Sequence, residues 1–238
     1  QLSEKWNYSL TAPPNSDMIY SMNVAEAHKI TGGLSNPSKM PGKAHNISAF
    51  DCIMGSELAE KENSVCSDCY ARKGRYRFAN VQNALKRRLA ALDHPLWIPA
   101  MVRLIGKQEY FRWFDSGDLQ SVLHLEKILA VIELTPDTKH WLPTKEYSII
   151  KEYLYMTNTN VFPKNVVVRL SAFFIDQLPK IGSYYKARGV LGSMVYKDKS
   201  TIEDTDVYGC PAYTQDNECG DCRACWERDH EIVGYPKH

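Results

Sequence analysis

The sequence predicts an α/β fold in which short strands and amphipathic helices alternate around a parallel sheet. Two observations support this prediction. Apolar runs typical of buried strands are separated by helical patterns, and polar turns follow several of those runs. About four or five strands can be identified in this way, fewer than a closed eight-stranded barrel needs. We therefore expect an open sheet or a partial (β/α) barrel.

The first part of the chain is predicted to be irregular and then helical. Residues 1–50 are rich in turn formers and predict an N-terminal arm with one short helix at 24–30. Apolar residues at helical spacing predict a helix over 70–92, which ends before Pro95. The next helix is predicted over 97–105.

The middle of the chain alternates between strand and helix patterns. Its predicted strands are 110–114, 140–142, 166–170 and 189–196, and its predicted helices are 121–133 and 146–156. Parallel sheets place their chemistry at the carboxyl ends of the strands. The residues that follow these strands, Gly117, Asp118, Thr144 and Ser171, are therefore candidate cofactor-binding residues.

The turn at 115–118 carries two carboxylates around a glycine. Such carboxylates can hold an ammonium group or act as a general acid or base. The alternative is an ordinary turn whose Asp caps the following helix.

Composition places the chain among globular proteins. It has 238 residues, of which 44% are apolar and 24% are charged, and its formal net charge is +1. This charge provides no general attraction to nucleic acid or to anionic membranes. No apolar run is long enough to span a bilayer, and the N-terminus lacks a signal-peptide pattern. We expect a cytoplasmic protein with no membrane partner.

The seven cysteines lie in two groups separated by 140 residues without cysteine. An odd number of cysteines in a chain without a signal peptide argues against a disulfide framework, so we interpret both groups as metal ligands. The chain is divided accordingly into a partial barrel with a cluster loop, residues 1–205, and a Cys-rich, cluster-binding tail, residues 206–238. The two groups are Cys52, Cys66 and Cys69, and Cys210, Cys219, Cys222 and Cys225.

The C-terminal group has the spacing of an iron–sulfur loop. Cys219, Cys222 and Cys225 are separated by two residues at each step, so three thiolates converge from seven residues, and Cys210 provides a fourth. This pattern predicts a [4Fe–4S] cluster. A structural zinc site with four cysteine ligands is the alternative.

The N-terminal group offers three thiolates and no evident fourth ligand. A [4Fe–4S] cluster held by three cysteines leaves one iron open, which is typical of catalytic rather than structural metal sites. The alternative is a single cluster, in which Cys66 and Cys69 complete a site begun by the C-terminal cysteines. We expect two clusters.

Basic and aromatic residues alternate over 72–78, directly after Cys69. This pattern is compatible with nucleic acid binding, with compensation of the negative charge of a cluster, or with an ordinary solvated helix face.

Five segments resemble one family, the phage-encoded gene product eighty-eight proteins. The resemblance runs from about Ser38 to the C-terminus and implies a viral origin, so the expected location is the host-cell cytoplasm. The five segments are 66–76, 111–121, 140–147, 168–172 and 219–226.

More distantly, the arrangement resembles radical S-adenosylmethionine (SAM) enzymes. That resemblance implies a partial barrel in which Cys52, Cys66 and Cys69 hold the SAM-binding cluster, and an auxiliary cluster in the C-terminal tail. Gly117 and Asp118 would bind the methionine amino group of SAM. Ser171 would lie near the ribose.

These observations support two hypotheses for the function. The first is an iron–sulfur protein that performs radical or redox chemistry on an unidentified substrate. Its open iron would face Asp118 and Ser171, and Lys73, Arg75 or Arg77 would attract a carboxylate-bearing ligand such as SAM. The second is a non-enzymatic cluster or zinc protein that binds nucleic acid or a host protein during infection.

Overall fold

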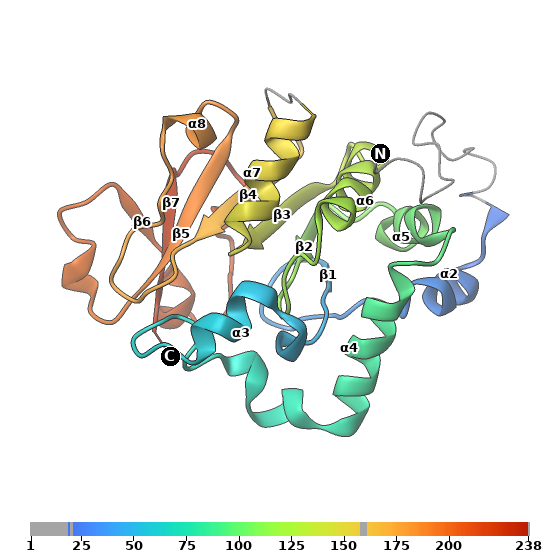
Figure 1. Ribbon diagram of the computed structural model, residues 1–238, viewed down its shortest axis with the longest axis horizontal. Helices are drawn as coiled ribbons and strands as arrows, with labels where there is room; N and C mark the ends of the chain where they lie inside the picture. Colours follow the sequence, from blue (N-terminus) through green and yellow to red (C-terminus); the bar gives the residue numbers. More distant parts are fainter. Residues whose placement is uncertain (1–18, 20, 158–160, 238) are drawn as a thin grey trace.

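The computed structural model of the protein describes residues 19, 21–157 and 161–237. Within these residues, seven strands form one sheet in the order β1-β2-β3-β4-β5-β7-β6, and every neighbouring pair is parallel. Strands β1 to β5 therefore lie side by side in sequence order (Figure 1). The predicted α/β class with a parallel sheet is confirmed.

The four predicted strands are present with small changes at their ends, as β2 to β5. The sequence patterns did not identify β1, β6 and β7, which also belong to the sheet. Two of these have only three residues, too few to show a periodic pattern. The strands are β1 (Lys43–His45), β2 (Tyr110–Trp113), β3 (Lys139–Thr144), β4 (Val166–Ser171), β5 (Val190–Tyr196), β6 (Val207–Gly209) and β7 (Ile232–Pro236).

Four helices also match their predictions closely, namely α2, α5, α6 and α7. No helix in the described part of the chain is both long and apolar enough to cross a membrane. The helices are α2 (Val24–Thr31), α3 (Ile53–Ala59), α4 (Ala79–Ala91), α5 (Trp97–Ile105), α6 (Val122–Glu133), α7 (Tyr147–Met156) and α8 (Ser183–Lys186).

The predicted helix over 70–92 is wrong in its first third. Two short 3₁₀ turns, Tyr70–Arg72 and Gly74–Arg77, precede α4. Gly74 has φ +49°, a left-handed conformation that interrupts a right-handed helix, and Phe78 is extended before α4 begins. Apolar spacing alone does not reveal such a break.

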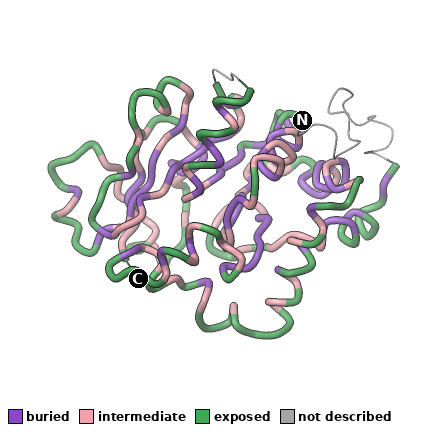
Figure 2. Tube along the Cα trace, viewed as in Figure 1, coloured by how far each residue is buried: buried purple, intermediate pink, exposed green. Residues whose placement is uncertain are grey.

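The two faces of the sheet have different partners. Alternate strand residues such as Phe111 and Val168 pack in one core with Met101 of α5, Ile128 of α6 and Ile150 of α7. In Figure 1, α6, α7 and α8 lie toward the top of the view and α3 and α4 toward the bottom. Buried residues concentrate along the central strands (Figure 2).

The opposite face carries the C-terminal segment. Trp141 of β3 packs there with Cys225 and Trp226, and the Trp226 indole N–H donates to the Phe111 carbonyl at 3.0 Å. Since β6 and β7 also join the sheet, the Cys-rich tail is part of the same structure as the strands. The irregular arm predicted for residues 1–50 lies partly outside the described residues.

Candidate functional site

A cavity of about 460 Å³ opens at the carboxyl ends of the central strands. Its lining includes all three cysteines of the N-terminal group and all four residues that the sequence selects at strand ends. The structure thus brings together seven residues from five segments of the chain. They are Cys52, Cys66, Cys69, Gly117, Asp118, Thr144 and Ser171.

Local backbone geometry places the three thiols. Cys52 is the extended residue directly before α3, and Cys69 is the extended residue directly before the turn Tyr70–Arg72. The Cys69 N–H donates to the Cys66 carbonyl at 3.3 Å, so these two residues share one tight turn. All seven cysteines of the protein are free thiols.

Gly55 leaves open space beside two of these sulfur atoms. A Cβ atom at this position would lie 2.8 Å from Cys52 Cβ, 3.3 Å from Cys52 Sγ and 3.8 Å from Cys66 Sγ. Any side chain on this face of α3 would therefore crowd the thiols.

The surroundings of Cys52 and Cys66 favour the neutral thiol when no cation is bound. Burial raises the pKa of the Cys52 thiol, and the nearby Asp118 carboxylate and the other two cysteines raise it further. Burial also raises the pKa of Cys66, against the opposing influence of Lys145. A bound metal would have to displace these protons, since thiolates are the ligand form.

Asp118 organises the strand ends and has little capacity for an external ligand. Its Oδ1 accepts from the Thr144 hydroxyl at 2.6 Å and from the Leu119 N–H at 2.8 Å. Its Oδ2 accepts from the Lys145 N–H at 2.8 Å. Burial raises the pKa of this carboxyl, and these hydrogen bonds oppose the shift.

Only glycine fits at position 117. Its φ is +79°, and a Cβ atom there would lie 2.3 Å from Ile47 Cγ1 and 2.8 Å from the Ile47 carbonyl oxygen. The Ser116 hydroxyl donates to the same carbonyl at 2.8 Å. The turn after β2 is therefore fastened to the segment after β1.

Glu146 follows β3 at a strand end, where the sequence predicts functional residues, but its partner could not be predicted from the sequence. Its Oε1 accepts from the Met54 N–H at 2.8 Å, in the first turn of the helix that Cys52 precedes. The residue is 2% exposed, and burial raises the pKa of its carboxyl to about 7. The two residues are 92 positions apart, so only the fold brings them together.

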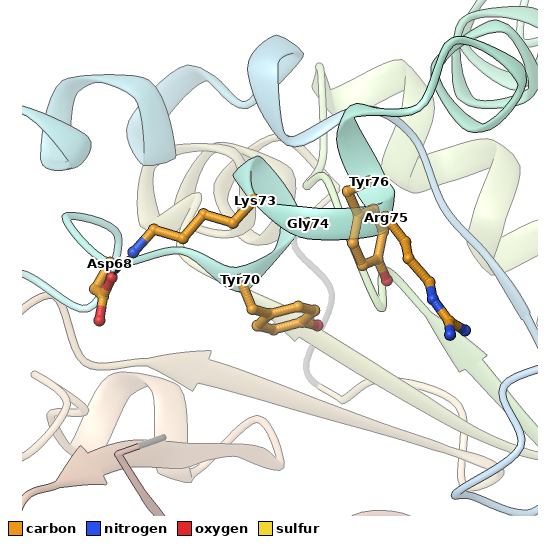
Figure 3. Close-up of a pocket in the computed structure, with 6 residues that line it drawn as sticks. All are labelled: Asp68, Tyr70, Lys73, Gly74, Arg75 and Tyr76. Atoms are coloured by element: carbon orange, nitrogen blue, oxygen red, sulfur yellow. Dashed lines mark hydrogen bonds and ion pairs between the residues drawn. The ribbon is translucent and has the colours of Figure 1, made fainter.

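The basic residues expected at the cavity lie elsewhere. Lys73 pairs with Asp68, and Arg75 extends away from that pair along a shallow neighbouring pocket (Figure 3). Neither lines the cavity, and nor does Arg77. The cavity takes its positive charge from Arg112, Lys145 and Lys237, because the 3₁₀ turns carry residues 73–77 past its rim.

The C-terminal cysteines form a separate group on the sheet face that packs against the C-terminal segment. Cys210, Cys222 and Cys225 pack among aromatic residues of β3, β6 and β7. The Tyr235 hydroxyl lies 3.2 Å from Cys225 Sγ, and the Tyr208 hydroxyl lies 3.6 Å from Cys222 Sγ. None of the four C-terminal cysteines is among the residues that line the cavity.

The sequence model of the family described as Gene product 88 matches residues 21–228. The chain belongs to the Gene product 88 family. The resemblance seen in five sequence segments is therefore confirmed. No curated protein and no solved structure matches the chain.

In the described residues of this Gene product 88 protein, no three His, Cys, Asp or Glu side chains are grouped so that they could hold a single metal ion. A four-iron cluster makes a different demand, because each of its irons takes its own thiolate. Its ligands surround a volume and do not converge on one point.

Proposed function

We propose that this Gene product 88 family protein holds a [4Fe–4S] cluster on Cys52, Cys66 and Cys69 and supports radical or redox chemistry on a small ligand in the adjoining cavity. The observation that carries the proposal is the location of all three thiols in the lining of one cavity at the strand ends. With these three cysteines as its ligands, a bound cluster would have one iron without a cysteine ligand. Viral origin would place this chemistry in an infected cell.

The residues present fit such a cluster. The thiols are free, and Gly55 keeps the space beside two of the sulfur atoms clear. Lys145 contributes positive charge close to the Cys66 thiol, which suits a negatively charged, thiolate-ligated cluster. When bound, the cluster would supply one-electron transfer and an open coordination position.

The protein's own residues bind and orient the ligand. The cavity volume of about 460 Å³ lies within the usual range for small-molecule sites, about 300–1,000 Å³. Ser171 presents a hydroxyl at a strand end, Thr144 holds Asp118 in place, and Glu146 fixes the start of the helix that Cys52 precedes. The near-sequential parallel strands suit a partial barrel of the radical-SAM type, so SAM is the first ligand to test.

We assign a second cluster to Cys210, Cys219, Cys222 and Cys225. Hydrogen bonds between two of these sulfurs and the hydroxyls of Tyr235 and Tyr208 are the kind of contact that adjusts a cluster's reduction potential. A zinc site on the same cysteines is the competing assignment, although these side chains are not grouped around a single ion in the described residues.

Metal and sulfide analysis of anaerobically purified protein tests both assignments. We expect iron and acid-labile sulfide in equal amounts, about eight of each per chain for two clusters. Stoichiometric zinc without sulfide would contradict the proposal. Iron and sulfide at half this level, together with one zinc, would restrict the cluster to one group of cysteines.

Single cysteine variants locate each cluster. Because the two groups are separate, Cys69→Ala and Cys222→Ala should each lose about half of the iron, and the double variant should lose nearly all of it. Full iron retention in either single variant would contradict the ligand assignment.

Electron paramagnetic resonance of the reduced protein tests the radical chemistry. We expect SAM to change the spectrum of wild type and of Cys222→Ala but not that of Cys69→Ala, with 5′-deoxyadenosine formed under reducing conditions. An unchanged spectrum without this product would contradict SAM chemistry and leave only the cluster.

A further inference from the structure

Two side chains of opposite charge line the cavity without forming an ion pair. Arg112 is on β2 and Asp115 is in the turn that follows it, and both contribute to the lining. No carboxylate of the described residues lies within 4.0 Å of the Arg112 guanidinium. Each of the two side chains also keeps a buried polar atom without a hydrogen-bond partner.

The Arg112 guanidinium is held in place by uncharged neighbours. It lies over the Trp141 ring, 4.4 Å from the ring centroid, and its Nη1–H donates to the Met40 sulfur at 3.9 Å. The Tyr70 hydroxyl lies beside it. Its Nε–H is buried and has no partner within the described residues. A half-buried guanidinium whose Nε–H is unpaired is a strong site for a planar anion such as a carboxylate.

Asp115 also has a polar atom without a hydrogen-bond partner in the described residues. Its Oδ1 is buried without a donor in the described residues, whereas its Oδ2 has only a 3.4 Å contact with the Tyr76 hydroxyl. A buried carboxylate oxygen without a donor is costly, and a bound ammonium group would satisfy it.

The backbone between these two residues is strained. Phe114 has φ +59°, which is unusual for a residue other than glycine, and its N–H donates to the His45 carbonyl at 2.8 Å. This left-handed residue separates Arg112 from Asp115 and lies in the cavity lining itself. Conformational strain of this kind is concentrated at ligand-binding sites.

We propose that Arg112 and Asp115 bind the carboxylate and the ammonium of an α-amino-acid group, so that the ligand of the cavity carries such a group. The inference rests on the proposed function in treating this cavity as the ligand site. It also moves the ammonium contact away from Asp118, whose oxygens are already occupied by Thr144, Leu119 and Lys145.

Two kinds of ligand carry an α-amino-acid group and could bind here: SAM itself and an amino-acid substrate. Binding to the iron-loaded, full-length protein separates them, with tryptophan fluorescence as the readout because Trp141 lies beneath Arg112. The probes are SAM, each of the twenty common L-amino acids, and methylthioadenosine, which keeps the nucleoside of SAM but lacks the amino-acid group. Binding of SAM but of no free amino acid would assign the site to SAM, and binding of a free amino acid would assign it to a substrate.

Charge-neutral variants test the two contacts separately. Arg112→Gln should weaken binding of the amino-acid ligand at least about tenfold, and Asp115→Asn should do the same, because each removes one charge-assisted contact. Both should leave methylthioadenosine binding unchanged. Arg112→Lys keeps the charge without the planar fork and should recover part of the affinity. Arg75→Gln, in the neighbouring shallow pocket, is the matched control and should bind like wild type (Figure 3).

Three results would overturn the inference: equal affinity of wild type and Arg112→Gln, an equal loss for methylthioadenosine, or no binding of SAM or any amino acid to iron-loaded protein. Iron and sulfide are measured on the same samples. If anaerobically purified protein contains no iron or sulfide but still binds a probe through Arg112, this inference is upheld and the proposed function is contradicted. Iron-loaded protein that binds none of the probes would contradict this inference alone.

Discussion

Gly55 lies on α3 within one helical turn of Cys52, and the absence of a side chain there leaves room for the Cys52 and Cys66 side chains close to the helix. Alanine has the higher helix propensity by about 1 kcal/mol, so Gly55→Ala would favour α3 considered alone. The added Cβ would nevertheless lie 2.8 Å from Cys52 Cβ, closer than two carbon atoms can approach. Space for the sulfur atoms therefore conflicts with helix propensity at this residue.

We predict that Gly55→Ala folds but loses about half of its iron, because only the N-terminal group is crowded. Gly182→Ala is the control, since a Cβ at that position meets no atom within 4 Å. Iron analysis with far-UV circular dichroism checks both variants. Full iron content in Gly55→Ala would show that the thiols do not need this space.

Some residues of the site could be predicted from the sequence and others could not. The cysteines and the strand-end residues were predicted, because spacing and strand position are local features. Gly55 and Arg112 were missed as members of the site, and the partner of Glu146 was not predicted. Their roles depend on contacts with residues far away in the sequence, such as the bond from Met54 to Glu146.

At the scale of elements, the longer patterns were predictable and the short ones were not. Apolar spacing identified α5 over its whole length and placed α6 and α7 to within a residue. Strands of three residues such as β1 and β6 gain their stability from neighbours in the sheet, so their own residues contain little signal. The segment directly after Cys69 forms two 3₁₀ turns, although its apolar spacing predicts an α-helix.

Arg169 of β4 holds the C-terminal segment against the sheet. It is fully buried, and its guanidinium donates to the carbonyls of Ala224 at 2.9 Å, Glu227 at 3.0 Å and His230 at 3.1 Å. Ala224 precedes Cys225, so this one side chain helps to place a C-terminal thiol. Loss of the side chain leaves several buried carbonyls without donors, at about 1–3 kcal/mol each.

We predict that Arg169→Met destabilises the protein by about 3–5 kcal/mol and increases amide exchange over residues 224–231. The C-terminal half of the iron should be lost and the N-terminal half retained. Hydrogen exchange and iron analysis measure the two effects, with the exposed Arg75→Met as the control. If the amides of residues 224–231 are as well protected from exchange in Arg169→Met as in wild type, Arg169 does not hold this segment against the sheet.

Across the whole molecule, three buried histidines lie between the first strands and the helices. His45 of β1, His124 of α6 and His140 of β3 pack edge-on or stacked against Trp97, Trp113 and neighbouring rings. Burial lowers the pKa of His124 and of His140 to about 3, and that of His45 well below its usual 6.5. The folded protein thus keeps these rings neutral under conditions in which the unfolded chain protonates them.

This difference predicts that acid weakens the fold. A histidine with a lowered pKa contributes stability that is present above pH 6.5 and is lost as the pH falls toward about 3, because the unfolded state then binds the additional proton. Each such histidine adds up to about 1.4 kcal/mol per pH unit to the slope. The raised carboxyl pKa values of Glu146 and Asp118 act in the opposite direction, so the total slope of wild type does not isolate the histidines.

A single substitution does isolate one of them. His124→Gln keeps a polar side chain near the Gln120 N–H, which donates to His124 Nδ1 at 3.3 Å, but it cannot titrate. Denaturant unfolding at pH 7, 6, 5 and 4 should show wild type losing more stability than the variant at each step below pH 6.5. The free energy of unfolding of wild type relative to that of the variant should fall by up to about 1.4 kcal/mol per pH unit. Parallel curves would mean that His124 binds its proton equally well in both states, and the core would then have to admit a charged ring.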